Sequence, residues 1–401
     1  MGGGNIEESE FKIASEDIMK KLAIIALALF GVALVLGVAA CSNASGGGGN
    51  TTATTTTTTP TTPTGGGTGT DNGEGQQTGG GNGNEQTTVT ASCDYKKVDT
   101  VTINGIEYDI VVFGLWPQTI KADSVTVNKN TCQKETHGAF TYCKGSDNQW
   151  YVEQAEKAYG NYTYSDGTTV GKDETTTKWF KVEPIKWRVL TNSYGGNKLL
   201  LAESILTDGI QYYLNKSSRT IGGNTVYANN YKYSTIRAWL NGKYESDDTQ
   251  AATHAGKGFL QSAFTSAQQE QIKTTTVDNS AESTTDASNN IPQATSYKCG
   301  NTSDKIFLLS EQEVTTSAYG FDVYDASGAG NKRIRVTTDF AKATGAYQSS
   351  DTGMGGWWWL RSPYYNDATL ARDVSLTGDP NWSHSVDRIY GSVVPALCIS
   401  N

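Results

Sequence analysis

The chain has 401 residues, 18% of them charged, and a formal net charge of -9 at pH 7. An acidic chain without a cluster of Lys and Arg lacks the positive surface that nucleic acids require, so we expect no nucleic-acid partner. The length would allow two domains, but only the part after residue 90 has the composition of a globular domain.

A secretory signal is predicted for residues 19–41. A basic start is followed by a long apolar run that ends in VAAC at Cys41. Small residues directly before a cysteine resemble a bacterial lipobox, which predicts a lipid on Cys41 and an outer-membrane anchor with the protein facing the exterior. A single transmembrane helix is the alternative, because the run is nearly long enough to span a bilayer. Residues 1–18 are acidic where a signal is basic, so we expect translation to begin at Met19.

Residues 42–90 consist largely of Gly, Thr, Asn, Gln and Pro, without any apolar periodicity. Such a segment buries too little apolar surface to offset the entropy lost on ordering, so we predict a disordered tether. The globular domain is then residues 91–401.

Two hairpins are predicted from strand-like runs that flank short turn sequences. The turns are Asn104-Gly105 and Gly195-Gly196, and the runs are residues 100–103, 106–113, 186–190 and 198–202. Between the hairpins lies a polar insertion, residues 119–178, to which the sequence assigns no structure.

Few helices are expected. Ser234 precedes apolar residues at helical spacing in STIRAWLN, while Thr265 and Ser310 each begin a capping-box pattern. Thr338 or Asp339 would cap a short helix that ends at Gly345. With a short strand at residues 305–309, these elements predict an α+β fold of small antiparallel sheets with a few short helices.

Six cysteines include Cys41, which leaves an odd number in the domain. Cys132 and Cys143 bracket a short loop and are the candidate disulfide, if the compartment is oxidising. Cys299 and Cys398 are isolated in sequence, and we interpret both as buried packing residues. No Cys or His spacing predicts a metal site, and no cofactor is expected.

Residues 356–399 combine apolar ends, which predict buried strands, with a middle rich in aromatic and short polar residues. We expect the triple Trp at residues 357–359 to form core and support. Tyr, Trp, Asn, Ser, Asp and Arg make good contact surfaces, although a wet loop is the alternative. The predicted ligand-binding residues are Tyr364, Tyr365, Asn366, Asp367, Asp379, Asn381, Trp382, Ser383, His384, Asp387, Arg388 and Tyr390.

Several ordered motifs carry a family resemblance. WWWLRSP and GSVVPALCI, preceded by FGLWPQT, PIKWRVL, STIRAWLN and DKIFLLSEQE, resemble a bacterial family first catalogued as a domain of unknown function, with the ending WWLRSP...GVRPAL. Some members are variable proteins of diversity-generating retroelements, and the lipobox, tether and ending together resemble the treponemal variable lipoproteins. The resemblance implies a C-type lectin fold of the variety shared with formylglycine-generating enzyme, with variable residues on its ligand-binding face.

In such systems a reverse transcriptase misincorporates at template adenines. Every predicted contact residue except Trp382 can be reached from an AAC or AAT codon by changing adenines alone. Leu370, Arg372 and Leu376 are lower-ranked variable positions. Ser392 to Val394 depart from the family's GVRP, so the family's Arg is absent.

The resemblance implies a surface-displayed receptor that binds varied macromolecular ligands, chiefly proteins, and we expect a monomer without enzymatic activity. A fixed-specificity adhesin or carbohydrate-binding module is the alternative. The calcium-site motifs of sugar-binding C-type lectins are absent, and the isolated cysteines do not suggest the copper-binding pair of formylglycine-generating enzyme. His137 and His254 have no acid or cysteine at a catalytic spacing.

Overall fold

The structure is a computed structural model that describes residues 90–401, except 173–174, 244–250 and 285–296. The predicted signal, Cys41 and the tether therefore lie outside the described residues. The described residues belong to one compact unit. None of the described helices has both the length and the apolar composition needed to cross a membrane.

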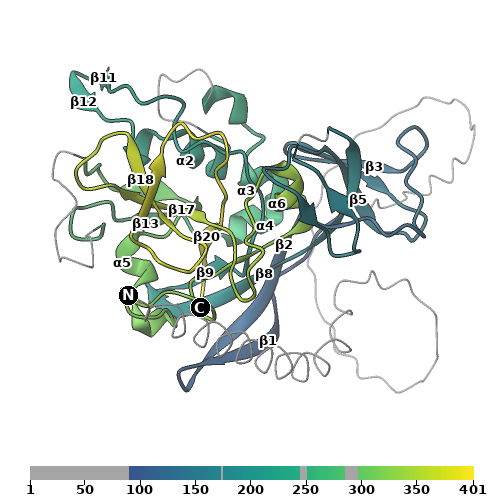
Figure 1. Cartoon of the computed structure of the whole chain (residues 1–401), viewed down its shortest axis with the longest axis horizontal. Coiled ribbons are helices and arrows are strands. Elements are labelled where there is room, and N and C mark those ends of the chain that lie inside the picture. The colour runs from purple at the N-terminus through teal and green to yellow at the C-terminus, as the bar shows by residue number, and fades with distance from the viewer. Residues whose placement is uncertain (1–89, 173–174, 244–250, 285–296) are drawn as a thin grey trace, which may run out of the picture. The chain divides into compact units, whose positions relative to one another are not determined.

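Within the described residues, the largest element is a nine-stranded antiparallel sheet (Figure 1). Its long strands β2 and β8 pair with each other, and β20, near the C-terminus, inserts between β15 and β9. The strands are β1 (Lys96–Ile103), β2 (Ile106–Ile120), β3 (Lys134–His137), β4 (Phe140–Lys144), β5 (Trp150–Ala155), β8 (Thr177–Tyr194), β9 (Asn197–Ala202), β15 (Ile306–Phe307) and β20 (Ala396–Ile399).

Both predicted hairpins are confirmed. The turn between β1 and β2 places Asn104 at φ 52° and Gly105 at φ 81°, a left-handed conformation that these residue types tolerate. The turn between β8 and β9 uses Gly195 and Gly196 in the same way. Local turn chemistry was therefore sufficient to locate both pairs.

The predicted helix starts are also confirmed. Ser234 caps α2 (Thr235–Asn241), and Thr265 and Ser310 form complete capping boxes at α4 (Ser266–Gln271) and α5 (Glu311–Val314). Of the two candidate caps for α6 (Asp339–Thr344), Thr338 takes the role. The remaining short helices are α3 (Phe259–Ala263), η1 (Tyr231–Tyr233), η2 (Ala251–His254) and η3 (Ser317–Tyr319).

Small sheets complete the fold, all of them antiparallel except for the pair β10 and β16. The domain is thus α+β and built mostly of antiparallel strands. These strands are β6 (Tyr162–Thr163), β7 (Thr169–Val170), β10 (Ser204–Ile205), β11 (Arg219–Ile221), β12 (Asn224–Val226), β13 (Thr275–Val277), β14 (Thr302–Asp304), β16 (Val336–Thr337), β17 (Trp358–Pro363), β18 (Leu370–Val374) and β19 (Trp382–Ser385).

The two apolar ends of residues 356–399 are buried, as predicted, and contain β17 and β20. They lie in different sheets: β20 joins the nine-stranded sheet, whereas β17 pairs with β18 in a three-stranded sheet. The polar middle contributes β18 and β19 to that smaller sheet. The three tryptophans at residues 357–359 are all buried, in agreement with a supporting role.

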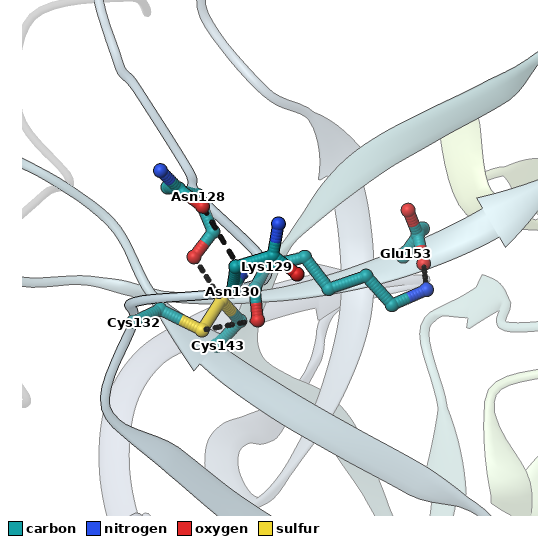
Figure 2. Close-up of a disulfide and its surroundings, with 6 residues drawn as sticks. All are labelled: Asn128, Lys129, Asn130, Cys132, Cys143 and Glu153. Atoms are coloured by element: carbon teal, nitrogen blue, oxygen red, sulfur yellow. Dashed lines mark hydrogen bonds and ion pairs between the residues drawn. A yellow bond between two sulfur atoms is a disulfide. The ribbon is translucent and has the colours of Figure 1, made fainter.

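The polar insertion forms β3 to β7 and carries a disulfide between Cys132 and Cys143, whose Cα atoms are 5.5 Å apart (Figure 2). The loop before Cys132 is further held by an ion pair between Lys129 and Glu153 on β5. Asn130 donates its backbone N–H to Oδ1 of Asn128 at 3.0 Å. Covalent and polar contacts therefore order a segment with few apolar residues.

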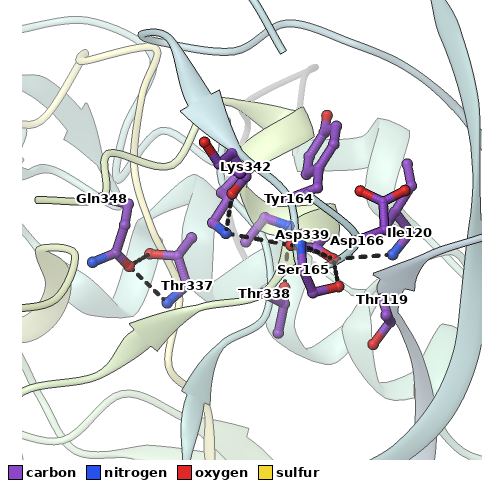
Figure 3. A network of polar contacts seen from close by, with 12 residues as sticks. Thr119, Ile120, Tyr164, Ser165, Asp166, Thr337, Thr338, Asp339, Lys342 and Gln348 are labelled. Carbon is purple, nitrogen blue, oxygen red and sulfur yellow. Dashed lines mark hydrogen bonds and ion pairs between the residues drawn. The ribbon is translucent and has the colours of Figure 1, made fainter. Parts of the chain in front are cut away.

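A buried carboxylate anchors the insertion to α6 (Figure 3). Asp339 accepts hydrogen bonds from the backbone N–H of Ile120 at 3.1 Å and of Ser165 at 3.0 Å. Lys342, one helical turn later, lies 3.3 Å from the same carboxylate. The side chain at the first residue of a short helix thus fixes two distant segments.

Removal of the disulfide is expected to weaken the domain. The double variant Cys132→Ser/Cys143→Ser should lose roughly 2–3 kcal/mol of unfolding free energy, because a short closed loop no longer restricts the unfolded chain. Urea unfolding with and without a thiol reductant measures this. Cys299→Ser is the control and should keep the reductant effect, whereas a wild-type midpoint that does not respond to reductant would contradict the expectation.

Candidate functional site

The three-stranded sheet divides the predicted ligand-binding residues between two faces. In its register Trp382 lies opposite Asp373, Ser383 opposite Arg372 and His384 opposite Ala371. Because side chains alternate along a strand, Trp382 and His384 point to one face and Ser383 to the other. Each face carries its own group of aromatic residues.

The first face borders a pocket of about 250 Å³, which we call the aromatic pocket. Three predicted residues line it, namely Trp382, His384 and Arg388, and the Trp382 side chain is 55% exposed. The other lining residues are Tyr159, Tyr347, Trp357, Asp373, Ser375, Thr377 and Leu376, the last of which was a lower-ranked variable position.

An imidazole and a carboxyl group form a pair inside the aromatic pocket. Nδ1 of His384 lies 2.7 Å from Oδ2 of Asp373, which is fully buried. Burial raises the pKa of Asp373, and the hydrogen bond to His384 opposes that rise. The His384 ring stacks on Trp357 with the ring centroids 4.5 Å apart. Two contacts therefore fix the orientation of the imidazole.

Arg388 supplies a positive charge at the same place. Its guanidinium carbon lies 5.3 Å from the centre of the Trp357 ring, in a cation–π arrangement. No carboxylate among the described residues forms a salt bridge with it. Its charge nevertheless acts on the buried carboxyl groups of Asp208 and Asp373, whose pKa values it lowers against the larger effect of burial.

The second face carries Tyr364 and Tyr365, which we call the tyrosine pair, with ring centroids 4.8 Å apart. The guanidinium of Arg372 lies 4.7 Å from the Tyr364 ring and donates to Oδ1 of Asn381 at 2.7 Å. Arg372 is fully buried and lies 3.6 Å from Glu311. Its buried setting suits a support beneath the tyrosine pair better than a variable contact.

Two other predicted residues stabilise turns. Asp367 accepts hydrogen bonds from the backbone N–H and the hydroxyl of Thr369, and these bonds lower the pKa of Asp367. Asp379 accepts from the backbone N–H of Asn381 at 2.9 Å. Such local bonds are typical of turn-forming Asp.

The remaining predicted residues lie at the borders of these groups. Asp387 lies 3.8 Å from Lys216, Tyr390 packs edge-on against Tyr159 with centroids 5.0 Å apart, and Asn366 is exposed.

Sequence reasoning missed three important residues of the aromatic pocket. Tyr159 comes from the polar insertion, Tyr347 from the segment after α6, and Asp373 from β18. The only local signal was the run of tyrosines in YGNYTY, at residues 159–164. Nothing in the sequence linked these segments to the C-terminal stretch.

A buried carboxylate holds the chain at Gly391 and Ser392. Asp208 accepts hydrogen bonds from Ser392 Oγ at 2.6 Å and from the backbone N–H of Gly391 at 3.1 Å. Burial raises the pKa of Asp208 to about 7, against the effect of these hydrogen bonds. Asp208 therefore anchors the return from the site to β20.

The two isolated cysteines do not have the character of reactive thiols. Cys398 is fully buried, and burial raises the pKa of its thiol to about 11. Cys299, which was predicted to be buried, is only half-buried and packs against the core, where burial raises the pKa of its thiol. The sequence reasoning overlooked an acidic neighbour of His137. Its Nε2 lies 3.2 Å from Glu135. Among the described residues no group of three His, Cys, Asp or Glu could hold a metal ion.

The fold and the site define an α+β domain, mainly of antiparallel strands, with an aromatic pocket beside a three-stranded sheet. The family model described as "Domain of unknown function (DUF6273)" matches residues 195–401, just over half of the chain, and the chain belongs to this family. Comparisons with curated proteins and with solved structures each gave no match.

Proposed function

We propose that the domain is a ligand-binding module of the C-type lectin type, anchored to the outer membrane through Cys41 and facing the exterior. Its C-terminal face, in this proposal, is diversified by a retroelement to bind varied macromolecular ligands, chiefly proteins. The protein acts as a variable receptor of the treponemal lipoprotein kind, as a monomer and without enzymatic activity.

One observation carries this proposal. Trp382, His384 and Arg388, which were selected from the sequence by residue type, border one pocket whose other walls come from the same C-terminal stretch and from Tyr159 and Tyr347. A pocket with a few convergent polar groups is the usual form of a binding site. The convergence supports binding at this face.

A second observation supports diversification, because it concerns whether substitutions at this face would destabilise the domain. The supporting residues Trp358, Trp359 and Leu360 are fully buried, whereas the selected residues are half-buried or exposed. Exposed substitutions away from core and caps typically change stability by less than about 0.5 kcal/mol. The residues of this face can therefore vary in sequence while the buried supporting residues keep the domain folded.

Sequencing the codons for residues 356–399 from many clones of one strain tests the proposal. Substitutions should cluster at residues 364–367 and 381–390, map to adenines in a nearby near-repeat, and spare residues 357–360 and 393–399. The DNA downstream should encode a reverse transcriptase. An invariant tail without a repeat would contradict diversification and favour a module of fixed specificity.

A further inference from the structure

The walls of the aromatic pocket are suited to a flat ligand. Trp357 and Trp382 line it from the C-terminal stretch, and Tyr159 and Tyr347 line it from elsewhere in the chain, with their rings edge-on at 5.7 Å. Aromatic rings prefer stacked or edge-to-face contacts with other rings. The lining therefore favours an aromatic ring over a branched aliphatic group.

One polar atom of the pocket is positioned to receive a hydrogen bond. Nδ1 of His384 is bonded to Asp373 at 2.7 Å, and His384 keeps 20% of its side chain exposed. An ionised carboxylate can only accept, so with Asp373 ionised the proton of this bond is on Nδ1, and Nε2 of a neutral imidazole then presents a lone pair. No described residue bonds that Nε2 atom. A ligand with an O–H or N–H group would satisfy it.

Charge and hydrogen bonding disfavour two other ligand classes. A cation would be repelled by Arg388, which already lies over the Trp357 ring. A sugar ring would need several polar partners, but the hydroxyl groups of Ser375 and Thr377 already bond each other at 3.0 Å. An uncharged ring with a single donor matches the lining better.

We infer that the aromatic pocket binds one aromatic ring that carries a hydrogen-bond donor, as in a Tyr or Trp side chain of a partner protein. The ring packs among Trp357, Trp382 and the two tyrosines, and its donor bonds Nε2 of His384. This inference rests on the proposed function, because it names the chemistry recognised at the same face.

The test of this inference is to titrate the purified protein with N-acetyl-tyrosinamide and, separately, with N-acetyl-phenylalaninamide. Binding is followed by NMR or calorimetry at about pH 8, where an ordinary imidazole is neutral. The tyrosine amide should bind three- to tenfold more tightly, roughly the effect of one hydrogen bond. The variant Trp382→Ala should weaken the binding of both amides.

The matched variant is Asp373→Leu/His384→Phe, which replaces both partners of the buried pair with apolar groups and so leaves no carboxylate unpaired. It should bind both amides equally, and its unfolding midpoint shows that it is folded.

Equal binding of the amides by the wild type, or no binding of either, overturns the inference. Tighter binding of N-acetyl-phenylalanine or of methyl glucoside than of the tyrosine amide also overturns it, in favour of an anionic or a sugar ligand. An invariant C-terminal tail would instead contradict diversification and leave this result unchanged.

Discussion

Replacement of Arg361 with Met is expected to lower the unfolding free energy by about 3–5 kcal/mol, because it leaves a largely buried carboxylate without its partner. Arg361 is the fully buried arginine of the WWWLRSP motif, and both Nη atoms contact the Glu313 carboxylate. It also donates to the carbonyl oxygens of Leu308 at 2.9 Å and of Asp278 at 3.2 Å. One side chain therefore joins β17, α5 and the segment after β13.

A double-mutant cycle with Glu313→Gln measures how much of this loss belongs to the ion pair. Urea unfolding of the two single variants and the double variant should give a coupling energy of at least about 1 kcal/mol. Arg361→Lys keeps the charge but loses the bidentate geometry, and its stability should fall between those of the wild type and Arg361→Met. Equal stability of wild type and Arg361→Met would show that the ion pair contributes little to the stability of the domain.

The variant Asp208→Asn is expected to be more stable than the wild type above pH 7. Burial raises the pKa of Asp208 from 3.8 to about 7, so between these values the native state holds a proton that the unfolded state releases. The contribution of Asp208 is therefore fully present below pH 3.8 and is lost as pH rises through about 7. The difference is on the order of 2–4 kcal/mol, at about 1.4 kcal/mol per pKa unit.

Asn suits this position because its Oδ1 can accept from the backbone N–H groups of Gly209 and Gly391, as Asp208 Oδ1 does. Its Nδ2 can donate to Ser392 Oγ. Urea unfolding from about pH 5 to pH 8 should give a falling wild-type curve and a flatter variant curve. Parallel curves would mean that Asp208 is already ionised across this range, and Asp208→Ala is the comparison that removes the hydrogen bonds.

The sequence predicted those elements whose cause is local. A two-residue turn at Asn104-Gly105 and capping boxes at Thr265 and Ser310 each depend on residues within a few positions of one another. The helix at Thr235–Asn241 followed from a cap and an apolar stripe. Such signals do not need the rest of the fold to be known.

The remainder depends on contacts between distant segments. The insertion showed no periodicity because its strands are short, and it is ordered by a disulfide, by the Asp339 carboxylate and by scattered apolar residues such as Tyr164 and Val170 that pack into the core. The tyrosines of the aromatic pocket lie far along the chain from Trp382. Arg372 and Asp373 look like surface residues in sequence, yet both are fully buried beside Glu311 and His384.

Side chains alternate between the two faces of the sheet along β19. This alternation limits which sequence changes the face that borders the aromatic pocket can accept. A one-residue slip of β19 against β18 would turn every β19 side chain to the opposite face, so that Trp382 and His384 would leave the aromatic pocket and point toward the side of Arg372. Substitution keeps the number of residues unchanged, so each β19 side chain stays on its original face of the sheet. A copying process that alters bases but keeps the number of codons is therefore compatible with this sheet, whereas a change of length that shifts the register of β19 would exchange the two faces of the sheet.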